Sequence, residues 1–463
     1  MLPWPPGKKG KSFSPSRLTG YVNLSRNFGK GRLLPGGTFR GRTFDKVGEK
    51  PGLRAGYMHL RVEKDKDLCQ NCFSCETLIP CPVNFQEDEC IGCGACTLAC
   101  PFGALKMVEG ERKEKIPLGI DGENYLVYQG ITLQAALESL SHKVAGDHQE
   151  VPFAPCGTGG CYTCALEGEG EIKRACVTGV EEGMKIKTRP SSSFTPRRIV
   201  GGFMGHGVGG VGTPWDLKGQ GYAETVLFTA GCNFRCPQCQ NWTTAFRGKE
   251  NAEYRARTPE GAAEIMTKVR KEYRVNRMAI SGGECTLNRE WLLGYLKELK
   301  RLNPDGEARF HVDTNGSLLT RDYLEELIRA GMTDMGIDLK GLKGETFRKL
   351  TGLEEDPRAD RYLDNAWQGV KYLRENYRDR VFLGVGLPYN PDLISLEEIK
   401  EMGQIISEID PYIQVCPLDY RPSFRRQDLE RPSYSAMEKV YRTLKGTGLK
   451  TVICQTVFGY IGP

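Results

Sequence analysis

Three cysteines near the middle of the chain have the spacing of an iron–sulfur site with one open position. Cys232, Cys236 and Cys239 form the pattern C-x3-C-x2-C within TAGCNFRCPQCQNW. Three thiolates that share one [4Fe-4S] cube leave its fourth iron without a protein ligand, and an open coordination position is typical of catalytic metal sites. A zinc knuckle and a set of buried core thiols are the alternatives. Twelve other clustered cysteines, out of eighteen in the chain, favour the iron–sulfur interpretation.

Eight of those cysteines form an internal repeat, C-x2-C-x2-C-x5-C-P followed by C-x2-C-x2-C-x3-C-P. The proline after each final cysteine fixes φ and directs that ligand toward the other run. The array resembles the bacterial two-cluster ferredoxin, in which the fourth cysteine of each run binds the cluster of the other run. The resemblance implies two [4Fe-4S] clusters, one held by Cys69, Cys72, Cys75 and Cys100 and the other by Cys90, Cys93, Cys96 and Cys81. The first run has five residues instead of three before Cys81, which predicts a longer local loop.

A third group of four cysteines follows a β-grasp pattern. IPLGIDG and ENYLVYQG predict two strands joined by a turn at Asp121-Gly122, and TLQAALESLSHKV has helical spacing. The spacing Cys156-x4-Cys161-x2-Cys164-x11-Cys176 resembles that of [2Fe-2S] ferredoxins, with the short final gap of fumarate reductase iron–sulfur subunits. Glycines between the first two ligands suit a loop that wraps closely around a cluster. A zinc site is the alternative.

From residue 222 onward, predicted strands and helices alternate. The segments AETVLFTAG, RMAISGGE, ARFHVDTNG, DMGIDLKG, VFLGVGLP and YIQVCPLDY are typical of strands, and amphipathic helices lie between them. This pattern predicts a parallel α/β domain. Polar motifs stand at the ends of these strands, which is where active-site loops lie in (β/α) barrels.

The three-cysteine loop and the motif Ser281-Gly282-Gly283-Glu284 carry a family resemblance for the stretch 222–463. This stretch resembles the pyruvate formate-lyase activating enzyme group of the radical S-adenosylmethionine (SAM) enzymes. The resemblance implies a partial (β/α)6 barrel, a [4Fe-4S] cluster on the three cysteines, and SAM bound to the open iron. It also implies that Gly282 and Gly283 let the backbone approach the methionyl end of SAM, while Glu284 receives the SAM ammonium group.

Two further motifs, Asp313-Thr314-Asn315-Gly316 and Asp338-Leu339-Lys340, resemble the DTNG and DLK motifs of the same group. The resemblance assigns Asp313, Thr314 and Asp338 to a monovalent-cation site. It assigns Lys340 to contact with SAM or with a substrate peptide. The alternative is that each aspartate caps a helix or pairs with a basic side chain.

Three departures from that group leave the substrate open. The aromatic residue that usually precedes the third cluster cysteine is Gln238 here, so we expect Trp242 or Phe234 to replace it, or a polar contact with adenine. Cys285 stands where a proline often follows the GGE motif. The accessory cysteine clusters precede the barrel instead of following its cluster loop, and the [2Fe-2S] region is additional.

Several residues outside these motifs are of types that could take part in chemistry. Cys285 adjoins the SAM motif and is a candidate hydrogen donor or persulfide site, whereas Cys416 and Cys454 lie in apolar strands and are expected to be core thiols. His311 is expected to be a core histidine. The glycine run at 207–212 matches a dinucleotide fingerprint, but we expect no apolar strand before it and no helix after it, so we predict a lid or a close interdomain contact instead.

Composition divides the chain into five parts. Residues 1–60 carry twelve Lys and Arg against two acidic residues, so this Gly- and Pro-rich arm exceeds the net charge of +6 of the whole chain. We expect a solvated tail or strap, and binding to nucleic acid or to an acidic partner is the less favoured interpretation. The other parts are a two-cluster ferredoxin domain at 61–110, a β-grasp domain at 111–190, a linker at 191–220 and the barrel at 221–463.

Bulk properties restrict the location. A mean hydropathy of −0.44, the lack of a long apolar run and a polar start predict neither a membrane span nor a secretory signal. Cysteine arrays in a chain of this length indicate metal ligation in a reducing compartment rather than disulfides. We therefore expect a cytoplasmic, oxygen-sensitive protein.

These patterns together predict three [4Fe-4S] clusters, one [2Fe-2S] cluster and SAM. The expected electron donor is a low-potential ferredoxin or flavodoxin, and the expected product is a 5′-deoxyadenosyl radical. The family resemblance implies that the radical takes hydrogen from a glycine of a glycyl-radical-type protein. A small molecule or another peptide is the alternative substrate, and a non-catalytic electron-transfer subunit is the alternative function.

Overall fold

The computed structural model describes residues 59–111, 113–140 and 154–463. The basic arm expected at residues 1–60 therefore lies almost entirely outside the described residues. Within the described part of the chain, no helix is long and apolar enough to cross a membrane.

The region of the cysteine repeat consists of two short helices and one antiparallel strand pair. These elements are β1 (Leu60–Lys64), α1 (Ser74–Leu78), α2 (Ala95–Ala99) and β2 (Leu105–Glu109), with β1 paired to β2. Each helix begins after a left-handed residue, Phe73 with φ 56° and Gly94 with φ 67°. Because both residues follow the second cysteine of a run, the repeat seen in the sequence is also a repeat of backbone conformation.

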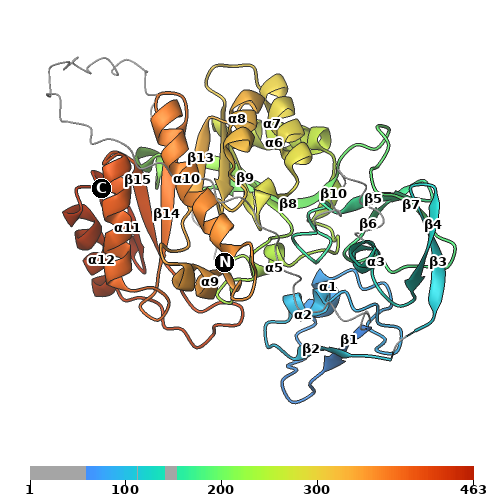
Figure 1. The fold of residues 1–463 in the computed structure, drawn as a ribbon. Helices are drawn as coiled ribbons and strands as arrows, with labels where there is room; N and C mark the ends of the chain where they lie inside the picture. The colour runs from blue at the N-terminus through green and yellow to red at the C-terminus, as the bar shows by residue number, and fades with distance from the viewer. Residues whose placement is uncertain (1–58, 112, 141–153) are drawn as a thin grey trace, which may run out of the picture. The chain divides into compact units, whose positions relative to one another are not determined.

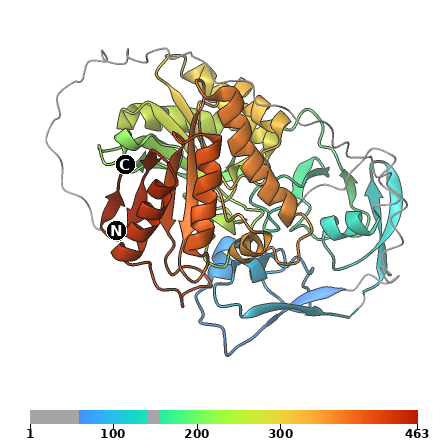
Figure 2. The same cartoon turned by 60° about the vertical axis from the view of Figure 1, so that its left-hand side comes forward.

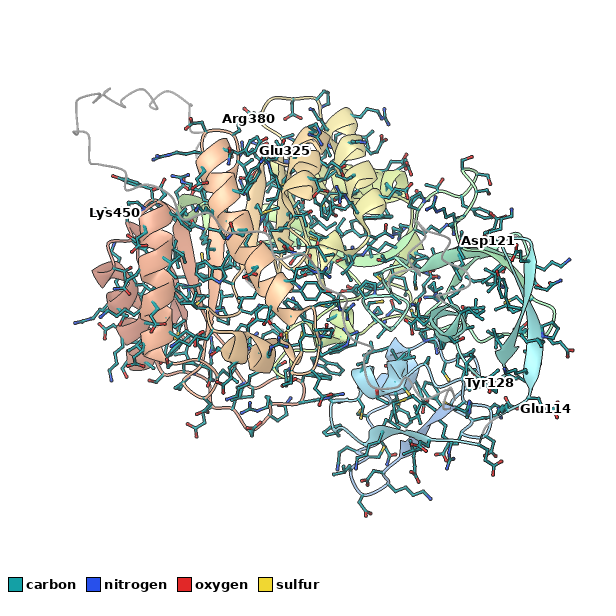
Figure 3. All side chains as sticks on the ribbon, in the orientation of Figure 1. Glu114, Asp121, Tyr128, Glu325, Arg380 and Lys450 are labelled. Atoms are coloured by element: carbon teal, nitrogen blue, oxygen red, sulfur yellow. The ribbon has the colours of Figure 1, made fainter. Side chains whose placement is uncertain are left out.

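The next region has the predicted β-grasp arrangement. Its elements are β3 (Lys115–Ile120), β4 (Glu123–Tyr128), α3 (Leu133–Ser139), β5 (Ala165–Gly168), β6 (Glu171–Arg174) and β7 (Lys185–Lys187), in the sheet order β4-β3-β7-β5-β6. The hairpin turn at Asp121-Gly122 is confirmed, with φ of 51° and 94°. Figure 3 shows Asp121 at one end of this hairpin, with Tyr128 and Glu114 at the other end. Helix α3 begins at Thr132, whose hydroxyl accepts a hydrogen bond from the Ala135 amide.

The C-terminal half contains a nine-stranded sheet in the order β10-β8-β9-β11-β12-β13-β14-β15-β16. The strands are β8 (Arg198–His206), β9 (Glu224–Thr229), β10 (Arg255–Arg257), β11 (Arg277–Gly282), β12 (Arg309–Thr314), β13 (Asp334–Asp338), β14 (Phe382–Tyr389), β15 (Gln414–Asp419) and β16 (Thr451–Val452). The seven strands from β9 to β16 in this order are parallel, while β8 and β10 are antiparallel. The predicted α/β class is confirmed.

Helices connect and cover these strands, as Figures 1 and 2 show. They are α5 (Trp242–Ala245), α6 (Pro259–Tyr273), α7 (Arg289–Leu302), α8 (Arg321–Ala330), α9 (Gly344–Thr351), α10 (Ala359–Tyr377), α11 (Leu396–Ile409) and α12 (Tyr434–Gly446). Side-chain N-caps at Thr258, Asn288, Ser395 and Ser433 set where four of them begin. A small hairpin of β17 (Cys454–Thr456) and β18 (Gly459–Ile461) follows β16.

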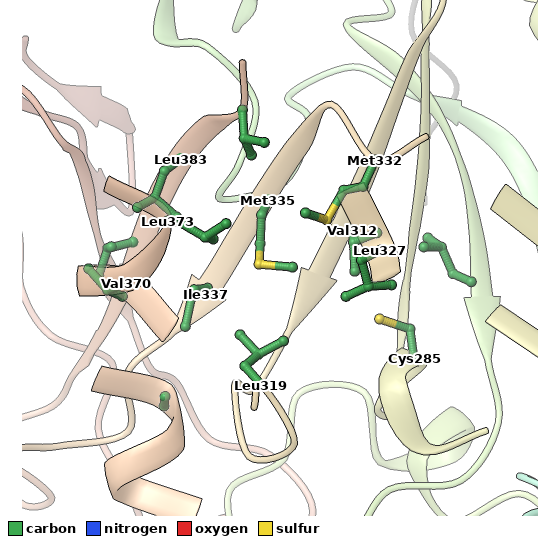
Figure 4. Close-up of a cluster of buried hydrophobic side chains, with 14 of the residues drawn as sticks. Cys285, Val312, Leu319, Leu327, Met332, Met335, Ile337, Val370, Leu373 and Leu383 are labelled. Carbon is green, nitrogen blue, oxygen red and sulfur yellow. The ribbon is translucent and has the colours of Figure 1, made fainter. Parts of the chain in front are cut away.

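The main hydrophobic core fills the space between the parallel strands and these helices. Its members include Val312 on β12, Met335 and Ile337 on β13, and Leu327 on α8. Figure 4 shows the Cys285 side chain within the same apolar group. Burial of aliphatic and aromatic side chains on this scale is the main contribution that stabilises the fold.

The predicted linker at 191–220 needs correction. Strand β8 (Arg198–His206) lies within it and pairs antiparallel with β9, and it directly precedes the glycine run at 207–212. The expectation of no strand before that run was therefore wrong. The signal was hidden because glycines at 201 and 202 and a register shift between Gly201 and Met204 interrupt the alternation expected of a strand.

Candidate functional site

The eight cysteines of the repeat surround two separate hollows. One hollow is lined by Cys69, Cys72, Cys75 and Cys100. The other is lined by Cys81, Cys90, Cys93 and Cys96, and Cys75 also borders it. All eight thiols are free. Four thiols around one hollow are the donor set of a [4Fe-4S] cluster, and the fourth cysteine of each run lies with the other run, so the residues fit the two predicted clusters.

The four cysteines of the β-grasp region converge on one buried point. Cys156, Cys161, Cys164 and Cys176 are at most 6% exposed, and the sulfurs of Cys156 and Cys161 lie 3.2 Å apart. Hydrogen bonds from Cys161 and Cys176 hold the pKa of Cys156 well below its usual value, which favours the thiolate that binds iron. This donor set fits a fully ligated [2Fe-2S] cluster.

The three cysteines of the central loop face a large cavity instead. Cys232, Cys236 and Cys239 line a space of about 1350 Å³, including its open mouth, together with the end of β11 at Ser281–Gly283. Burial raises the pKa of each of these three thiols to about 12. Three soft donors beside an open space fit a cluster whose fourth iron is accessible to a bound molecule.

Gly282 and Gly283 lie at the cavity, as predicted. Close backbone packing is a second reason why both positions need glycine. A side chain at Gly283 would come within 2.3 Å of the Gly231 carbonyl oxygen, and one at Gly282 within 2.4 Å of the Thr229 amide nitrogen. The Gly283 amide also donates to the Thr229 carbonyl at 2.8 Å. The two glycines therefore let the end of β11 pack directly against the residues that precede Cys232.

Glu284 does not line the cavity, contrary to the role that the resemblance implies. Its carboxylate is 1% exposed and accepts hydrogen bonds from the Thr286 and Asn315 amides and the Thr314 hydroxyl at 2.7–2.9 Å. The carboxylate thus fastens the end of β11 to the end of β12. Arg198, which the sequence analysis missed, donates to the Glu284 and Cys285 carbonyl oxygens from β8.

The residues expected to form a cation site are brought to the same cavity. Asp313, Thr314 and Asp338 all line it. Asp313 lies 3.0 Å from His311, and Asp338 lies 3.0 Å from Lys340, so each carboxylate has its own basic partner. Among the described residues, no group of three or more His, Cys, Asp or Glu side chains is arranged to hold a single metal ion.

Lys340 lies in the cavity wall beside the cysteine loop. Its ammonium group donates to Asp338 at 3.0 Å and to the Tyr420 hydroxyl at 2.7 Å. Burial acts to lower the pKa of Lys340, but Asp338 and Tyr420 outweigh it and hold the pKa well above its usual value. Burial also raises the pKa of Tyr420 to about 12. The lysine is therefore a cation oriented by two neighbours, one of which, Tyr420, the sequence analysis missed.

The two aromatic side chains expected to replace the one missing before Cys239 lie in different places. Phe234 lines the cavity, whereas Trp242 stacks on Phe424 with ring centroids 5.2 Å apart. Gln238 is buried and donates to the Leu350 carbonyl at 2.8 Å. Of the two expected replacements, Phe234 is the one that lines the cavity, where Tyr420 and Tyr460 also lie.

Of the cysteines outside the four clusters, Cys416 lines the cavity and Cys285 does not. Cys285 is fully buried in the apolar core, with its thiol donating to the Asp313 carbonyl at 3.1 Å, and it does not line the cavity. Cys416, expected to be a core thiol, lines the cavity from β15. Cys454 is a core thiol, as expected.

His311 belongs to a buried polar chain and not to an apolar core. Its Nδ1 lies 2.9 Å from the Glu224 carboxylate and its Nε2 lies 3.0 Å from Asp313. Burial acts to lower the pKa of His311, but the two carboxylates raise it to about 10. The glycine run packs against this chain, since the Gly210 amide donates to Glu224 at 2.8 Å and a side chain at Gly210 would collide with Asp313. This close contact lies within the barrel, whereas a lid or an interdomain contact was predicted.

Comparison with protein families gives three matches along the chain. Residues 83–106 match the 4Fe-4S binding domain, residues 113–191 the 2Fe-2S iron-sulfur cluster binding domain, and residues 226–402 the Radical SAM superfamily. The chain is thus an iron–sulfur protein of several domains. It contains a radical SAM domain preceded by 4Fe-4S and 2Fe-2S binding domains, as the cysteine spacing predicted. None of the three matches is specific to the activating-enzyme group that the sequence resembles.

Curated relatives are similar to part of the chain. A Saccharolobus islandicus protein named Probable GTP 3′,8-cyclase is 27% identical over 227 residues, which are 45% of this chain and 69% of that protein. A Thermococcus kodakarensis protein of the same name is 28% identical over 148 residues, which are 32% of this chain and 43% of that protein.

Two solved structures show weak similarity to part of this chain. SuiB of Streptococcus suis, solved with the precursor peptide SuiA, has a TM-score of 0.35 and 16% identity, covering 48% of this chain and 44% of that one. The structure of anSMEcpe with bound AdoMet has a TM-score of 0.35 and 14% identity, covering 48% of this chain and 61% of that one. The chain spans less than two thirds of the length of either.

Proposed function

We propose that the protein is an oxidoreductase that binds SAM in the cavity of the radical SAM domain and cleaves it reductively. The observation that carries the proposal is that Cys232, Cys236 and Cys239 line the same cavity as the Ser281–Gly283 strand end. A [4Fe-4S] cluster held by these thiols would supply one electron to the SAM sulfonium, which releases methionine and a 5′-deoxyadenosyl radical.

The other cavity residues bind and orient. The backbone at Gly282 and Gly283 lines the cavity, and we assign it to the methionyl end of SAM. The Lys340 ammonium is held by Asp338 and Tyr420 and offers a fixed positive charge to a carboxylate or carbonyl oxygen. Phe234 offers an apolar surface to the adenine or to the substrate.

For the substrate, we favour a polypeptide, specifically a glycine of a glycyl-radical-type protein. The charged side chains of the described cavity lining are Lys218, Lys340, Asp313 and Asp338, besides His206, so acidic and basic groups are balanced. Both lysines already have oxygen partners, since Lys218 donates to the Val208 and Gly210 carbonyls. Such a lining suits an uncharged backbone segment better than a triphosphate, which needs several free cationic or N–H donors.

A nucleotide substrate is the second candidate. It is favoured by the relatives named Probable GTP 3′,8-cyclase. A low-potential ferredoxin or flavodoxin would act as electron donor with either substrate. The accessory cysteine sites support an internal electron relay between that donor and the cavity.

The proposal is tested by incubating the anaerobically reconstituted protein with dithionite and SAM. We expect 5′-deoxyadenosine to form slowly without a substrate, and lack of any cleavage would contradict the proposal. A glycine-centred radical on a glycyl-radical-type protein from the same organism would support the first candidate. Faster 5′-deoxyadenosine formation and conversion of GTP upon addition of GTP would establish the second.

A further inference from the structure

The β-grasp cysteine loop packs directly against the central cysteine loop. A side chain at Gly231 would come within 3.0 Å of the Cys156 β-carbon and the Cys161 amide nitrogen. A side chain at Gly160 would collide with the Arg247 carbonyl and with the Gly231 amide. Gly231 has a φ of 86°, and an added carbon at Gly160 would lie 2.2 Å from the Arg247 carbonyl oxygen, so both positions favour glycine and the two loops pack closely here.

One arginine joins the two loops. Arg235 lies between the first two cysteines of the central pattern, and one of its nitrogens donates to the Cys232 and Phe234 carbonyls at 2.7 and 3.0 Å. Its other terminal nitrogen donates to the Pro155 and Cys156 carbonyls, both at 3.0 Å. A planar guanidinium with several donors can hold both loops in one fixed arrangement, which a lysine cannot do.

A second arginine joins the central loop to the ferredoxin region. The Arg425 amide donates to the carbonyl of Pro237, which lies between Cys236 and Cys239. The Arg425 guanidinium donates to the Cys100 carbonyl at 3.0 Å and to the Thr97 carbonyl. Cys100 lines the hollow of Cys69, Cys72 and Cys75, so this contact reaches the first of the two ferredoxin sites.

The neighbourhood of Arg425 fixes this second junction. The Ser423 hydroxyl donates to the Cys239 carbonyl at 2.8 Å. Phe424 is buried between Trp242 and Phe246, at centroid distances of 5.2 and 5.0 Å. The segment 423–425 is thus fastened to the central cysteine loop by hydrogen bonds and by aromatic packing, and it presents its guanidinium to the ferredoxin site.

We propose that the central cysteine site has two redox neighbours, with Arg235 as the positioning residue for the β-grasp site and Arg425 for the Cys100 site. The layout is therefore branched at the radical SAM domain and is not a single file of clusters. In each branch one electron leaves a reduced flanking site and arrives at the central site, and no bond forms or breaks. The inference takes the identity of the bound clusters from the proposed function, but its test uses neither SAM nor substrate.

Spin relaxation tests the two-neighbour layout. Dithionite-reduced wild type and a Cys232→Ala, Cys236→Ala, Cys239→Ala variant are compared by electron paramagnetic resonance at increasing microwave power. Because a paramagnetic neighbour speeds relaxation, we expect both the [2Fe-2S] signal and the ferredoxin-type signal to saturate at lower power in the variant. A change in only one of the two signals would indicate a single file, and unchanged signals would remove both junctions; either result overturns the proposal.

Redox titration tests the two arginines separately. Loss of a cation and of hydrogen bonds near a cluster lowers its midpoint potential, because the reduced, more negative form is stabilised less. We expect Arg235→Gln to lower the potential of the [2Fe-2S] site and Arg425→Gln to lower that of a ferredoxin site, each leaving the other site unchanged. Arg235→Lys should recover part of the shift, since it keeps the charge.

Arg301→Gln is the matched control, because Arg301 bonds Glu298 within α7 and contacts no cysteine loop. Iron content and circular dichroism verify that each variant is folded and loaded. Equal shifts at both sites from either arginine variant, or no shift from either, would overturn the assigned roles. A protein that shows the expected shifts but does not cleave SAM would retain this inference and lose the proposed function.

Discussion

Two cysteine sites that touch each other differ in one decisive respect. In the β-grasp site four thiols converge and are at most 6% exposed, so every coordination position of a bound cluster is filled by protein. In the central site three thiols line a space of about 1350 Å³, so one position faces the cavity. The number of thiols and the free space beside them thus suit a fully ligated cluster in one site and a cluster with an open iron in the other.

The largest effect is expected when the thiols of the central site are removed. Replacing Cys232, Cys236 and Cys239 with alanine should abolish 5′-deoxyadenosine formation, because no cluster remains beside the cavity. The iron content should fall from about fourteen to about ten atoms per chain, as expected from the ligand sets. Iron analysis and chromatography of the products measure both. Wild type with about four iron atoms, or with stoichiometric zinc, would contradict the multi-cluster account.

A smaller effect is expected where the two loops of the barrel meet. Gly283→Ala places a methyl group within 2.3 Å of the Gly231 carbonyl, so the strand end must move away from the cysteine loop. Overpacking of this kind costs roughly 1–3 kcal/mol, which predicts a rise of about five- to 150-fold in the KM for SAM. Gly306→Ala is the control, because no atom lies within 4 Å of its added carbon. Equal behaviour of the two variants in SAM titrations would show that the close approach is unimportant.

Lys340→Ala distinguishes productive hydrogen abstraction from abortive SAM cleavage in the cavity. Loss of a charged hydrogen-bonding group costs about 1.5–3 kcal/mol, so we expect hydrogen abstraction from the substrate to slow ten- to a hundredfold. Abortive SAM cleavage without substrate should slow less. Asp338→Ala should impair both, since it leaves the Lys340 ammonium with only Tyr420 as partner. If the ratio of productive to abortive cleavage is unchanged in Lys340→Ala, the small-molecule candidate becomes the leading one.

The smallest effect is expected at the closed site. Cys156→Ala or Cys161→Ala should leave turnover driven by dithionite nearly unchanged, because a small reductant reaches the central site without the relay. Turnover driven by a reduced ferredoxin or flavodoxin should fall. Loss of both activities to the extent seen in the central triple variant would show that the β-grasp site is structural or catalytic and does not act as a relay.

The cysteine groupings could be predicted from the sequence because short loops determine them. Spacings of two to five residues leave little freedom for the cysteines within one run. The exchange of the fourth cysteines between the runs was implied by the ferredoxin resemblance, and the two hollows follow it. The alternation of strands and helices was equally readable. Strand β8 was missed because its glycines and register shift remove the alternating pattern.

Contacts between distant segments could not be predicted. Arg235 meets the β-grasp loop across 79 and 80 positions, and Arg425 meets the ferredoxin region across 325 and 328 positions. Tyr420 reaches Lys340 across 80 positions. Cys285 lies in a short helical turn after β11 and Cys416 lies within β15, and the surrounding fold determines which way each side chain points. The sequence around a single cysteine does not show which way its side chain points. The same holds for Glu284, whose carboxylate is buried and does not line the cavity.

Addition of SAM to the dithionite-reduced protein tests the central claim most directly, with electron paramagnetic resonance as readout. The account predicts that SAM alters one [4Fe-4S] signal, that this signal is missing in the Cys232→Ala, Cys236→Ala, Cys239→Ala variant, and that the [2Fe-2S] signal is unaffected. A SAM-dependent change that persists in the variant, or a wild-type protein in which SAM alters no signal, would contradict the assignment of the open site.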